Sequence, residues 1–338
     1  MTQKALILGG RGKIGSHATK AFEKAGWRVV QYHRDRGDLN TLAKTADVIV
    51  NGLNPPAYHD WARTIPAITK QVIAAARQND ATVIIPGNVY NFGDRPGTWD
   101  ENTAQVPCSR KGRIRVEMEQ AYRDAGVKTI VLRAGNFIDP MRNECIGSMM
   151  FLRAIEKGKV TYAGRHDAMQ AYCYLPDWAR AAVMLAEKRE TLAPFEDVPL
   201  GGHAFTAQQL QSHLAARLGR NIKIVNFPWW FMTMAAPFWE LAREMREMRY
   251  LWSVDHALGT EKLQRLLPEF TPSPMPEVME AALPPQIHPD QKTYGQRRGD
   301  SAGLRSGAGR RVCRHDRTPG PYRHRTRDRR GQDLQRCV

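Results

Sequence analysis

The sequence predicts an α/β fold built on a doubly wound parallel sheet. Short apolar segments alternate with amphipathic segments of helical length throughout the first half of the chain. The first apolar segment, Ala5 to Leu8, runs directly into glycines spaced three residues apart. Such alternation is typical of parallel sheets, because each helix crosses back over the sheet before the next strand begins. A smaller region in the second half is expected to interleave with this sheet.

The glycine segment from Leu6 to Gly15 predicts a cradle for the phosphates of a dinucleotide. Gly9 permits a tight turn, Gly12 lets the backbone approach a pyrophosphate, and Gly15 lets helix and strand pack closely. The helix expected from Lys13 to Ala25 would aim its N–H groups and its dipole at the phosphates. This pattern indicates a Rossmann-type sheet. The cofactor contacts expected here are Gly9, Gly10, Arg11, Gly12, Lys13, Ile14 and Gly15.

The end of the second strand, Trp27 to Tyr32, sets the preference between NAD and NADP. An acidic residue there binds the ribose 2′-hydroxyl of NAD, whereas an arginine accommodates the 2′-phosphate of NADP. His33 and Arg34 stand at this strand end, and Arg11 projects from the glycine loop. These cations favour NADP(H) as the cofactor. Asp35 leaves NAD(H) open, because it lies near the spacing expected for a ribose-binding acid.

Further strands and helices continue the same alternation. A buried strand over Asp47–Asn51 leads into a Pro-containing turn, Gly52–Pro56. Because the carboxyl ends of parallel strands meet at one edge, Asn51, Asn54 and Asn88 are expected beside the cofactor. The other elements predicted in this half are a helix over Tyr58–Arg77, a strand over Ala81–Pro86, a helix over Arg110–Asp124 capped by Ser109, and a strand over Lys128–Leu132.

Composition separates a folded body from a basic tail. The chain has 338 residues, is 42% hydrophobic and carries a formal net charge of +16. From Lys292 onward, 14 Lys or Arg stand against 4 Asp, so this tail holds +10 and the rest of the chain +6. Because the tail is rich in Arg and Gly and poor in apolar residues, we expect it to be disordered. It could bind polyanions non-specifically or have no role, and no specific nucleic-acid partner is expected.

Cysteine usage and apolar run length exclude several protein classes. The five cysteines are scattered and show no CxxC spacing, so neither a disulfide framework nor a metal site is expected. No run of about 18 uninterrupted apolar residues occurs, so no membrane span is expected. The sequence opens on its first strand without a basic-then-apolar leader, which favours a cytoplasmic protein.

Four segments in a specific order carry a resemblance to a known family. They are the glycines at 9, 12 and 15, Asn88-Val89-Tyr90 with Gly93, Leu132-Arg133-Ala134-Gly135-Asn136-Phe137, and Tyr172-Cys173-Tyr174-Leu175-Pro176-Asp177. Together they make residues 1–189 resemble an extended or atypical short-chain dehydrogenase/reductase of the NAD-dependent epimerase/dehydratase kind. The resemblance implies NADP binding at the glycine loop and Arg34, with residues 51–56 lining the nicotinamide side.

The chain departs from this family where its catalytic residues should stand. Such enzymes carry a Tyr, and a Lys four residues later, at the start of the helix placed here at Arg110, but this chain has Lys111 without the Tyr. The Ser or Thr expected before Val89 is also absent. The spacing of Lys111, Ile114, Arg115 and Glu119 resembles the isoflavone-reductase-like branch, in which a lysine replaces the tyrosine as acid/base. Lys111 is therefore the catalytic candidate, and Tyr90, Tyr172 and Tyr174 are alternatives.

The second half is expected to bind the substrate. Its predicted elements are a helix near Ile146–Lys157, strands over Lys159–Tyr162 and Gln170–Tyr174, a helix over Asp177–Arg189 capped by Asp177, a strand near Asp197–Gly202 and a helix over Thr206–Leu218. Eight aromatic residues crowd the segment 226–252, where a core or a pocket wall is favoured over a membrane-surface helix. The expected division is a dinucleotide-binding core over 1–135, a partly interleaved substrate region over 136–291, and the tail over 292–338.

Three functions remain open at this level. The favoured one is an NADP-dependent oxidoreductase acting on a small, apolar carbonyl, alcohol or activated double bond, with Lys111 handling the proton. The second is an NAD(P)-dependent epimerase or dehydratase acting on a sugar-like substrate, which the missing Tyr disfavours. The third is a non-catalytic sensor of NADP(H). A homodimer is a further expectation, since it is common in this fold.

Overall fold

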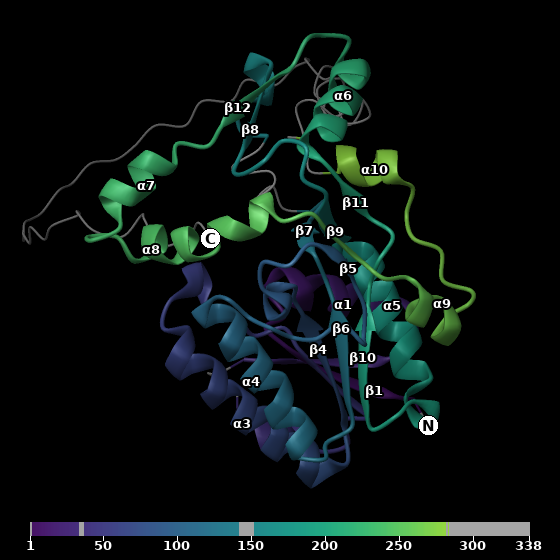
Figure 1. Cartoon of the computed structure of the whole chain (residues 1–338). Coiled ribbons are helices and arrows are strands. Elements are labelled where there is room, and N and C mark those ends of the chain that lie inside the picture. Colours follow the sequence, from purple (N-terminus) through teal and green to yellow (C-terminus); the bar gives the residue numbers. More distant parts are fainter. Residues whose placement is uncertain (1, 34–36, 142–151, 282, 284–338) are drawn as a thin grey trace, which may run out of the picture. The chain divides into compact units, whose positions relative to one another are not determined.

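A six-stranded parallel sheet forms the centre of the computed structural model, which describes residues 2–33, 37–141, 152–281 and 283. The strand order is β10-β6-β4-β3-β1-β2, and every neighbouring pair is parallel (Figure 1). The order reverses between β1 and β3, which is where a doubly wound sheet opens a crevice for ligands. The predicted fold is confirmed. The strands are β1 (Lys4–Leu8), β2 (Arg28–Tyr32), β3 (Val48–Asn51), β4 (Thr82–Gly87), β6 (Thr129–Arg133) and β10 (Phe195–Pro199).

Helices cover both faces of the sheet. Figure 1 shows α3 (Trp61–Asn79) and α4 (Arg110–Asp124) on one face, while α1 (Lys13–Lys24) packs with α5 (Leu175–Glu187) on the other. Side chains alternate along each strand, so Ile7 joins the core beneath α1 and α5 and Leu6 joins the core beneath α3 and α4. The continuous apolar runs of the sequence reflect this double burial. A short helix, α2 (Leu39–Ala43), adds to the second core.

The remaining strands form three small sheets, and β10 completes the large one. β10 lies at its edge beside β6. The small sheets have the orders β11-β9-β7, β12-β8 and β13-β5. The added strands are β5 (Gly97–Trp99), β7 (Asn136–Ile138), β8 (Lys159–Tyr162), β9 (Gln170–Tyr174), β11 (Ala204–Phe205), β12 (Lys223–Asn226) and β13 (His256–Leu258), and the added helices are α6 (Ala207–Leu218), α7 (Trp229–Ala235), α8 (Glu240–Glu247), α9 (Glu261–Leu266) and α10 (Met275–Glu280).

Two expected helix starts were wrong. The helix predicted from Tyr58 begins at Trp61, because Ala57, Tyr58 and Asp60 have positive φ values of 52°, 60° and 46° that no α-helix contains. Asp177 does not cap α5, which begins at Leu175. Its carboxylate instead accepts hydrogen bonds from the backbone and the hydroxyl of Ser273.

Several expectations fall outside the described residues. They include Arg34 and Asp35, most of the helix predicted near Ile146–Lys157, and the whole tail over 292–338. The described end of that helix, Ile155–Lys157, is a single 3₁₀ turn. The division of the chain at residue 135 remains a prediction. Within the described part of the chain, no helix has the length and apolar character needed to cross a membrane.

Candidate active site

The glycine loop between β1 and α1 has the shape of a phosphate cradle. Gly9 adopts a φ of +73°, and a Cβ on it would lie 2.8 Å from the carbonyl oxygen of Gly52, in the turn after β3. A Cβ on Gly15 would lie far inside van der Waals contact of the Gly9 carbonyl oxygen. The Gly12 N–H donates to that same oxygen across 2.8 Å, which closes the turn. Side chains at Gly9 and Gly15 would collide with the backbone of the loop and of the turn after β3, so the shape of the cradle requires glycine at both positions.

The start of α1 is suited to an anion. Gly12 is its N-cap and supplies no side-chain hydrogen bond, and the first turn contains no acidic residue. An uncapped helix N-terminus attracts negative charge through its backbone N–H groups and its dipole. The residues present therefore fit a nicotinamide dinucleotide whose pyrophosphate lies at the Gly9–Gly15 loop.

Valine at position 15 is expected to weaken dinucleotide binding by about tenfold or more, equivalent to about 1.4 kcal/mol. The new Cβ would collide with the Gly9 backbone, so the loop must move away from the position that the phosphates require. Titration with NAD and with NADP measures the effect. Gly26→Ala is the matched control. Gly26 also has a positive φ (+83°) but open space around it, so this variant should lose stability and keep its dinucleotide affinity. Equal affinities of Gly15→Val and wild type would contradict the cradle.

The other residues expected at the cofactor differ in their exposure to solvent. Ile14 is buried beneath the loop, Arg11 is exposed, and His33 is half-buried after β2. Gly10 faces the Gln31 side chain, which would lie 2.5 Å from a Cβ at that position. Lys13 opens α1. Their roles in binding remain predictions, as does that of Arg34.

The three asparagines lie at the carboxyl edge of the sheet, because Asn51 ends β3, Asn54 follows β3 and Asn88 follows β4. Asn51 is buried, donates to the Tyr122 hydroxyl across 3.3 Å and accepts from the Leu53 N–H, so its amide fixes the turn. Asn54 is exposed, and its oxygen accepts from Arg115 across 2.9 Å. Asn88 accepts from the Tyr90 N–H through its side chain. Asn54 and Asn88 are thus the more open of the three to a ligand.

Lys111 is fully buried at the start of α4, and two carboxylates of α8 hold it. Its Nζ forms ion pairs with Glu244 and, at 2.7 Å, with Glu247. Its backbone N–H also donates to Glu247 across 3.0 Å. The hydrogen bond from Lys111 and its charge lower the pKa of Glu247, although burial alone would raise it. The ammonium is therefore neutralised by acids that lie about 130 residues further along the chain.

Two tyrosines join this cluster. Lys111 Nζ lies 5.1 Å from the centre of the Tyr58 ring, in a cation–π contact. The hydroxyls of Tyr58 and Tyr90 lie 3.3 Å apart within hydrogen-bond distance. Burial raises the pKa of Tyr58 well above its usual value and also raises the pKa of Tyr90. Both phenols therefore keep their protons at neutral pH, and the structure brings the two catalytic candidates, Lys111 and Tyr90, together through Tyr58.

The alternative candidates Tyr172 and Tyr174 contact residues outside the Lys111 cluster. Tyr172 on β9 is buried and stacks on Phe205 with ring centres 3.9 Å apart. The Tyr174 hydroxyl donates to Glu277 across 3.4 Å. Among the described residues, the stacking contact of Tyr172 and the hydrogen bond of Tyr174 are with Phe205 and Glu277 and not with the Lys111 cluster, so Tyr90 is the better placed of the three phenols.

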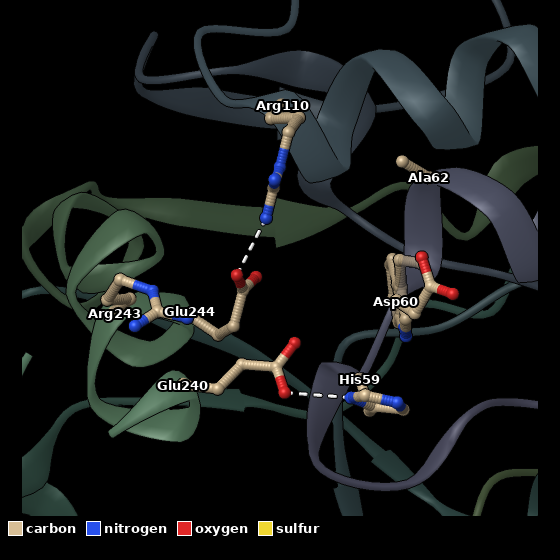
Figure 2. Close-up of a pocket in the computed structure, with 8 residues that line it drawn as sticks. His59, Asp60, Ala62, Arg110, Glu240, Arg243 and Glu244 are labelled. Carbon is tan, nitrogen blue, oxygen red and sulfur yellow. Dashed lines mark hydrogen bonds and ion pairs between the residues drawn. The ribbon is translucent and has the colours of Figure 1, made fainter. Parts of the chain in front are cut away.

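A polar pocket of about 330 Å³ lies beside this cluster, between the turn before α3, the start of α4, and α8. Figure 2 shows its two ion pairs, one from Arg110 to Glu244 and one from His59 to Glu240, each 2.7 Å long. Glu244 therefore links the pocket to Lys111. The lining residues are His59, Asp60, Trp61, Ala62, Arg110, Glu240, Arg243 and Glu244.

A buried arginine, Arg133, links several elements next to the site through hydrogen bonds. Arg133, at the end of β6, donates to Glu119 of α4 across 2.8 Å and to Asp197 of β10 across 2.5 Å. It also donates to the Asn88 carbonyl oxygen across 2.7 Å. The two carboxylates raise the pKa of Arg133 against the opposing effect of burial, so this side chain stays charged. The network ties the turn after β4 to β6, β10 and α4.

Sequence reasoning missed Tyr58, Glu244 and Glu247. The sequence predicts Tyr58 at the start of a helix, which gives no indication that its hydroxyl reaches Tyr90. The two glutamates lie on a short amphipathic helix, and nothing in the local pattern connects them to a lysine in the first half of the chain. The sequence alone indicates that a buried lysine needs an acidic partner, but it does not indicate that this partner lies on α8.

The cradle, the carboxyl edge and the proton-bearing side chains together define an α/β enzyme that binds a nicotinamide dinucleotide. The chain belongs to the NAD dependent epimerase/dehydratase family, whose model matches residues 5–201. The resemblance drawn from the four sequence segments is thereby confirmed, and the chain is an NAD(P)-dependent enzyme of this family. No curated protein matches the chain significantly.

Solved structures of sugar-nucleotide enzymes share this fold. MoeE5 in complex with UDP-glucose and NAD matches with a TM-score of 0.65 and 14% identity, over 86% of this chain and 99% of that one. The UDP-glucuronic acid 4-epimerase from Bacillus cereus, in complex with UDP-glucuronic acid and NAD, has a TM-score of 0.64 at 15% identity, over 83% and 98%. A UDP-galactose 4-epimerase has a TM-score of 0.58 at 19% identity, over 83% and 96%. At these identities the likeness shows the fold alone.

Proposed function

We propose that this enzyme is an NAD(P)-dependent epimerase or dehydratase acting on a sugar-nucleotide-like substrate. The observation that carries the proposal is the cluster of Lys111, Tyr58 and Tyr90, whose proton-bearing atoms gather at the same sheet edge as the glycine cradle. Membership of the epimerase/dehydratase family supports the reaction class, and structural neighbours that hold UDP-sugars and NAD support the substrate class.

The residues of the chain supply the proton chemistry. When bound, the dinucleotide supplies reversible hydride transfer. Lys111 holds protons at Nζ, and its two carboxylate partners fix the position of that atom at the start of α4. Because Lys111 and the two phenols carry protons, they can donate to a substrate oxygen that develops negative charge, and the carboxylate of Glu244 or Glu247 can accept the proton that a substrate hydroxyl loses. Lys111 thereby takes the role that the family gives to tyrosine.

Arg115 stands four residues after Lys111, where the family carries a lysine. Its guanidinium is buried, lies 4.7 Å from the Trp61 ring and donates to Asn54 across 2.9 Å. Burial lowers the pKa of Arg115, but arginine stays protonated at neutral pH. We infer that Arg115 supplies the fixed positive charge of this position.

A second candidate is the NADP-dependent oxidoreductase that the sequence favoured. Lys111 supports the oxidoreductase, because a lysine at this helix start is the feature that the chain shares with the isoflavone-reductase-like branch. The substrate would then be a small apolar carbonyl compound, alcohol or activated double bond, and the reaction would consume the reduced cofactor.

Cofactor stoichiometry separates the candidates. The purified chain is incubated with NAD(H) or NADP(H) and a panel of UDP-sugars and small carbonyl compounds. Sugar conversion without net change in absorbance at the nicotinamide band supports the proposed function, whereas net oxidation of the reduced cofactor supports the oxidoreductase. Tight cofactor binding with no conversion of either panel would overturn both and favour the sensor.

We propose NADP(H) as the preferred cofactor, since Arg11 is exposed on the glycine loop and Arg34 follows β2 in the sequence. Arg34→Asp is expected to shift the ratio of NADP to NAD affinity toward NAD by about 10- to 100-fold, because a charge-assisted hydrogen bond to phosphate contributes about 1.5–3 kcal/mol. The two dissociation constants, measured side by side, check it. Arg28→Asp, at the exposed start of β2, is the matched control and should leave the ratio unchanged. An unchanged ratio in Arg34→Asp would overturn the assignment of Arg34 to the 2′-phosphate of NADP.

A further inference from the structure

An exposed apolar patch lies on α7 and the turn that leads to α8. Five large side chains form this aromatic patch, with exposed fractions of 67% for Trp230, 49% for Phe231, 70% for Met234, 93% for Phe238 and 42% for Trp239. In the described part of the chain, the other exposed large apolar residues are Val106 and Met141. The expectation that these aromatics form core or pocket wall is therefore wrong for the patch, although Trp252 is buried.

The exposure does not come from a loosely held segment. Met232, Ala236 and Ala242 are buried together and join α7 to α8 through a small core. The Trp229 indole N–H donates to the Ala163 carbonyl oxygen across 2.6 Å and anchors the start of α7. The inner face of the α7–α8 hairpin is thus already packed. The aromatic patch is a second apolar face, and the fold leaves it in water.

The charges around the aromatic patch are positive. Arg243, Arg246 and Arg249 are exposed on α8 and just beyond it. The three acids of α8 are engaged with cations of other elements, since Glu240 pairs with His59 and both Glu244 and Glu247 pair with Lys111. The α7–α8 hairpin therefore carries the aromatic patch together with exposed arginines, of which Arg249 lies 5.3 Å from the centre of the Trp229 ring.

We propose that the aromatic patch docks on the surface of a membrane containing anionic lipids. Tryptophan and phenylalanine side chains favour the boundary between headgroups and acyl chains, and neighbouring arginines attract anionic headgroups. A protein partner fits less well, because a stable interface takes roughly 20–30 residues a side and the patch has five apolar side chains. The docked protein lies on the surface, since none of its described helices has the length to span it. This proposal is independent of the reaction catalysed.

Vesicle binding by the full chain tests the proposal. The wild type is sedimented with vesicles of phosphatidylcholine alone and of phosphatidylcholine with phosphatidylserine, beside the double variant Trp230→Ser/Phe238→Ser. The basic tail is present in both proteins, so the difference between them reports the aromatic patch. We expect the wild type to favour phosphatidylserine vesicles and the double variant to bind them about tenfold more weakly or worse, since each lost ring removes a large apolar surface.

Two further variants sharpen the result. Val106→Ser, an exposed apolar residue outside the patch, should bind vesicles as the wild type does. Arg243→Gln/Arg246→Gln should weaken binding to phosphatidylserine vesicles alone. Circular dichroism confirms that each variant is folded. Equal vesicle binding by the wild type and Trp230→Ser/Phe238→Ser would overturn the proposal, and so would a solution dimer that this double variant dissociates without any vesicle binding.

Discussion

Replacing Lys111 with methionine is expected to lower the turnover number by about 10²- to 10⁴-fold, the usual contribution of a positioned proton donor. Methionine keeps the length of the side chain but holds no proton at the position of Nζ. The dinucleotide affinity should stay unchanged, because the glycine cradle lies on a different loop. Turnover is measured on the sugar nucleotide that the substrate panel identifies, and cofactor affinity is measured by titration.

The structure requires a control for the carboxylates that Lys111 leaves behind. Lys111→Met would leave Glu244 and Glu247 with the exposed Arg110 as their remaining cation among the described residues, and removing one partner of a buried pair costs about 3–5 kcal/mol of unfolding free energy. The triple variant Lys111→Met/Glu244→Gln/Glu247→Gln removes those charges and should recover most of the stability without recovering turnover. Arg110→Met removes the ion pair that the exposed Arg110 makes with the buried Glu244 and leaves Lys111 as the partner of Glu244, so it should lower stability less than Lys111→Met and leave turnover nearly unchanged. Turnover near the wild-type value in the triple variant would assign the proton step to Tyr58 or Tyr90.

Local pattern was enough to predict the sheet and the cradle. Strand period, helix period and glycine spacing are properties of adjacent residues, so the segment from Lys4 to Gly15 specifies its own strand, turn and helix start. The three asparagines were likewise placed at the correct edge, because parallel strands end on the same side of a sheet. These predictions needed no knowledge of distant contacts.

The chemistry around Lys111 depends on contacts that no local pattern encodes. Glu247 lies 136 residues from Lys111, and their pairing follows from the docking of α8 rather than from any spacing. Tyr58 reaches Tyr90 only because positive φ values delay the start of α3. The exposure of the aromatic segment could not be predicted from the sequence either. Both faces of the α7–α8 hairpin are apolar, so composition does not indicate which face packs and which remains in water.

Replacing Arg133 with methionine is expected to lower the free energy of unfolding by about 3–5 kcal/mol at neutral pH. The guanidinium is fully buried and holds two carboxylates, Glu119 at 2.8 Å and Asp197 at 2.5 Å. Methionine leaves both acids without their cation and also frees the Asn88 carbonyl oxygen. Urea denaturation measures the loss. Arg165→Met is the matched control, because Arg165 also pairs with two aspartates but lies half-exposed, so about 0–1 kcal/mol is expected.

The pH dependence of the stability that Arg133→Met loses shows whether stranded charge or lost packing causes the loss. Burial already raises the pKa of Asp197 in the wild type, and loss of the guanidinium removes the main opposing effect. A raised folded-state pKa means that the folded variant takes up a proton more readily than the unfolded chain, so its stability relative to wild type rises as pH falls. The loss of unfolding free energy should therefore shrink below about pH 5 and be full above about pH 7, given ordinary carboxyl pKa values near 4.

The triple variant Arg133→Met/Glu119→Gln/Asp197→Asn is the control, and it should recover most of the stability and lose this pH dependence. A deficit of constant size across this range would mean that lost packing, not stranded charge, explains the effect.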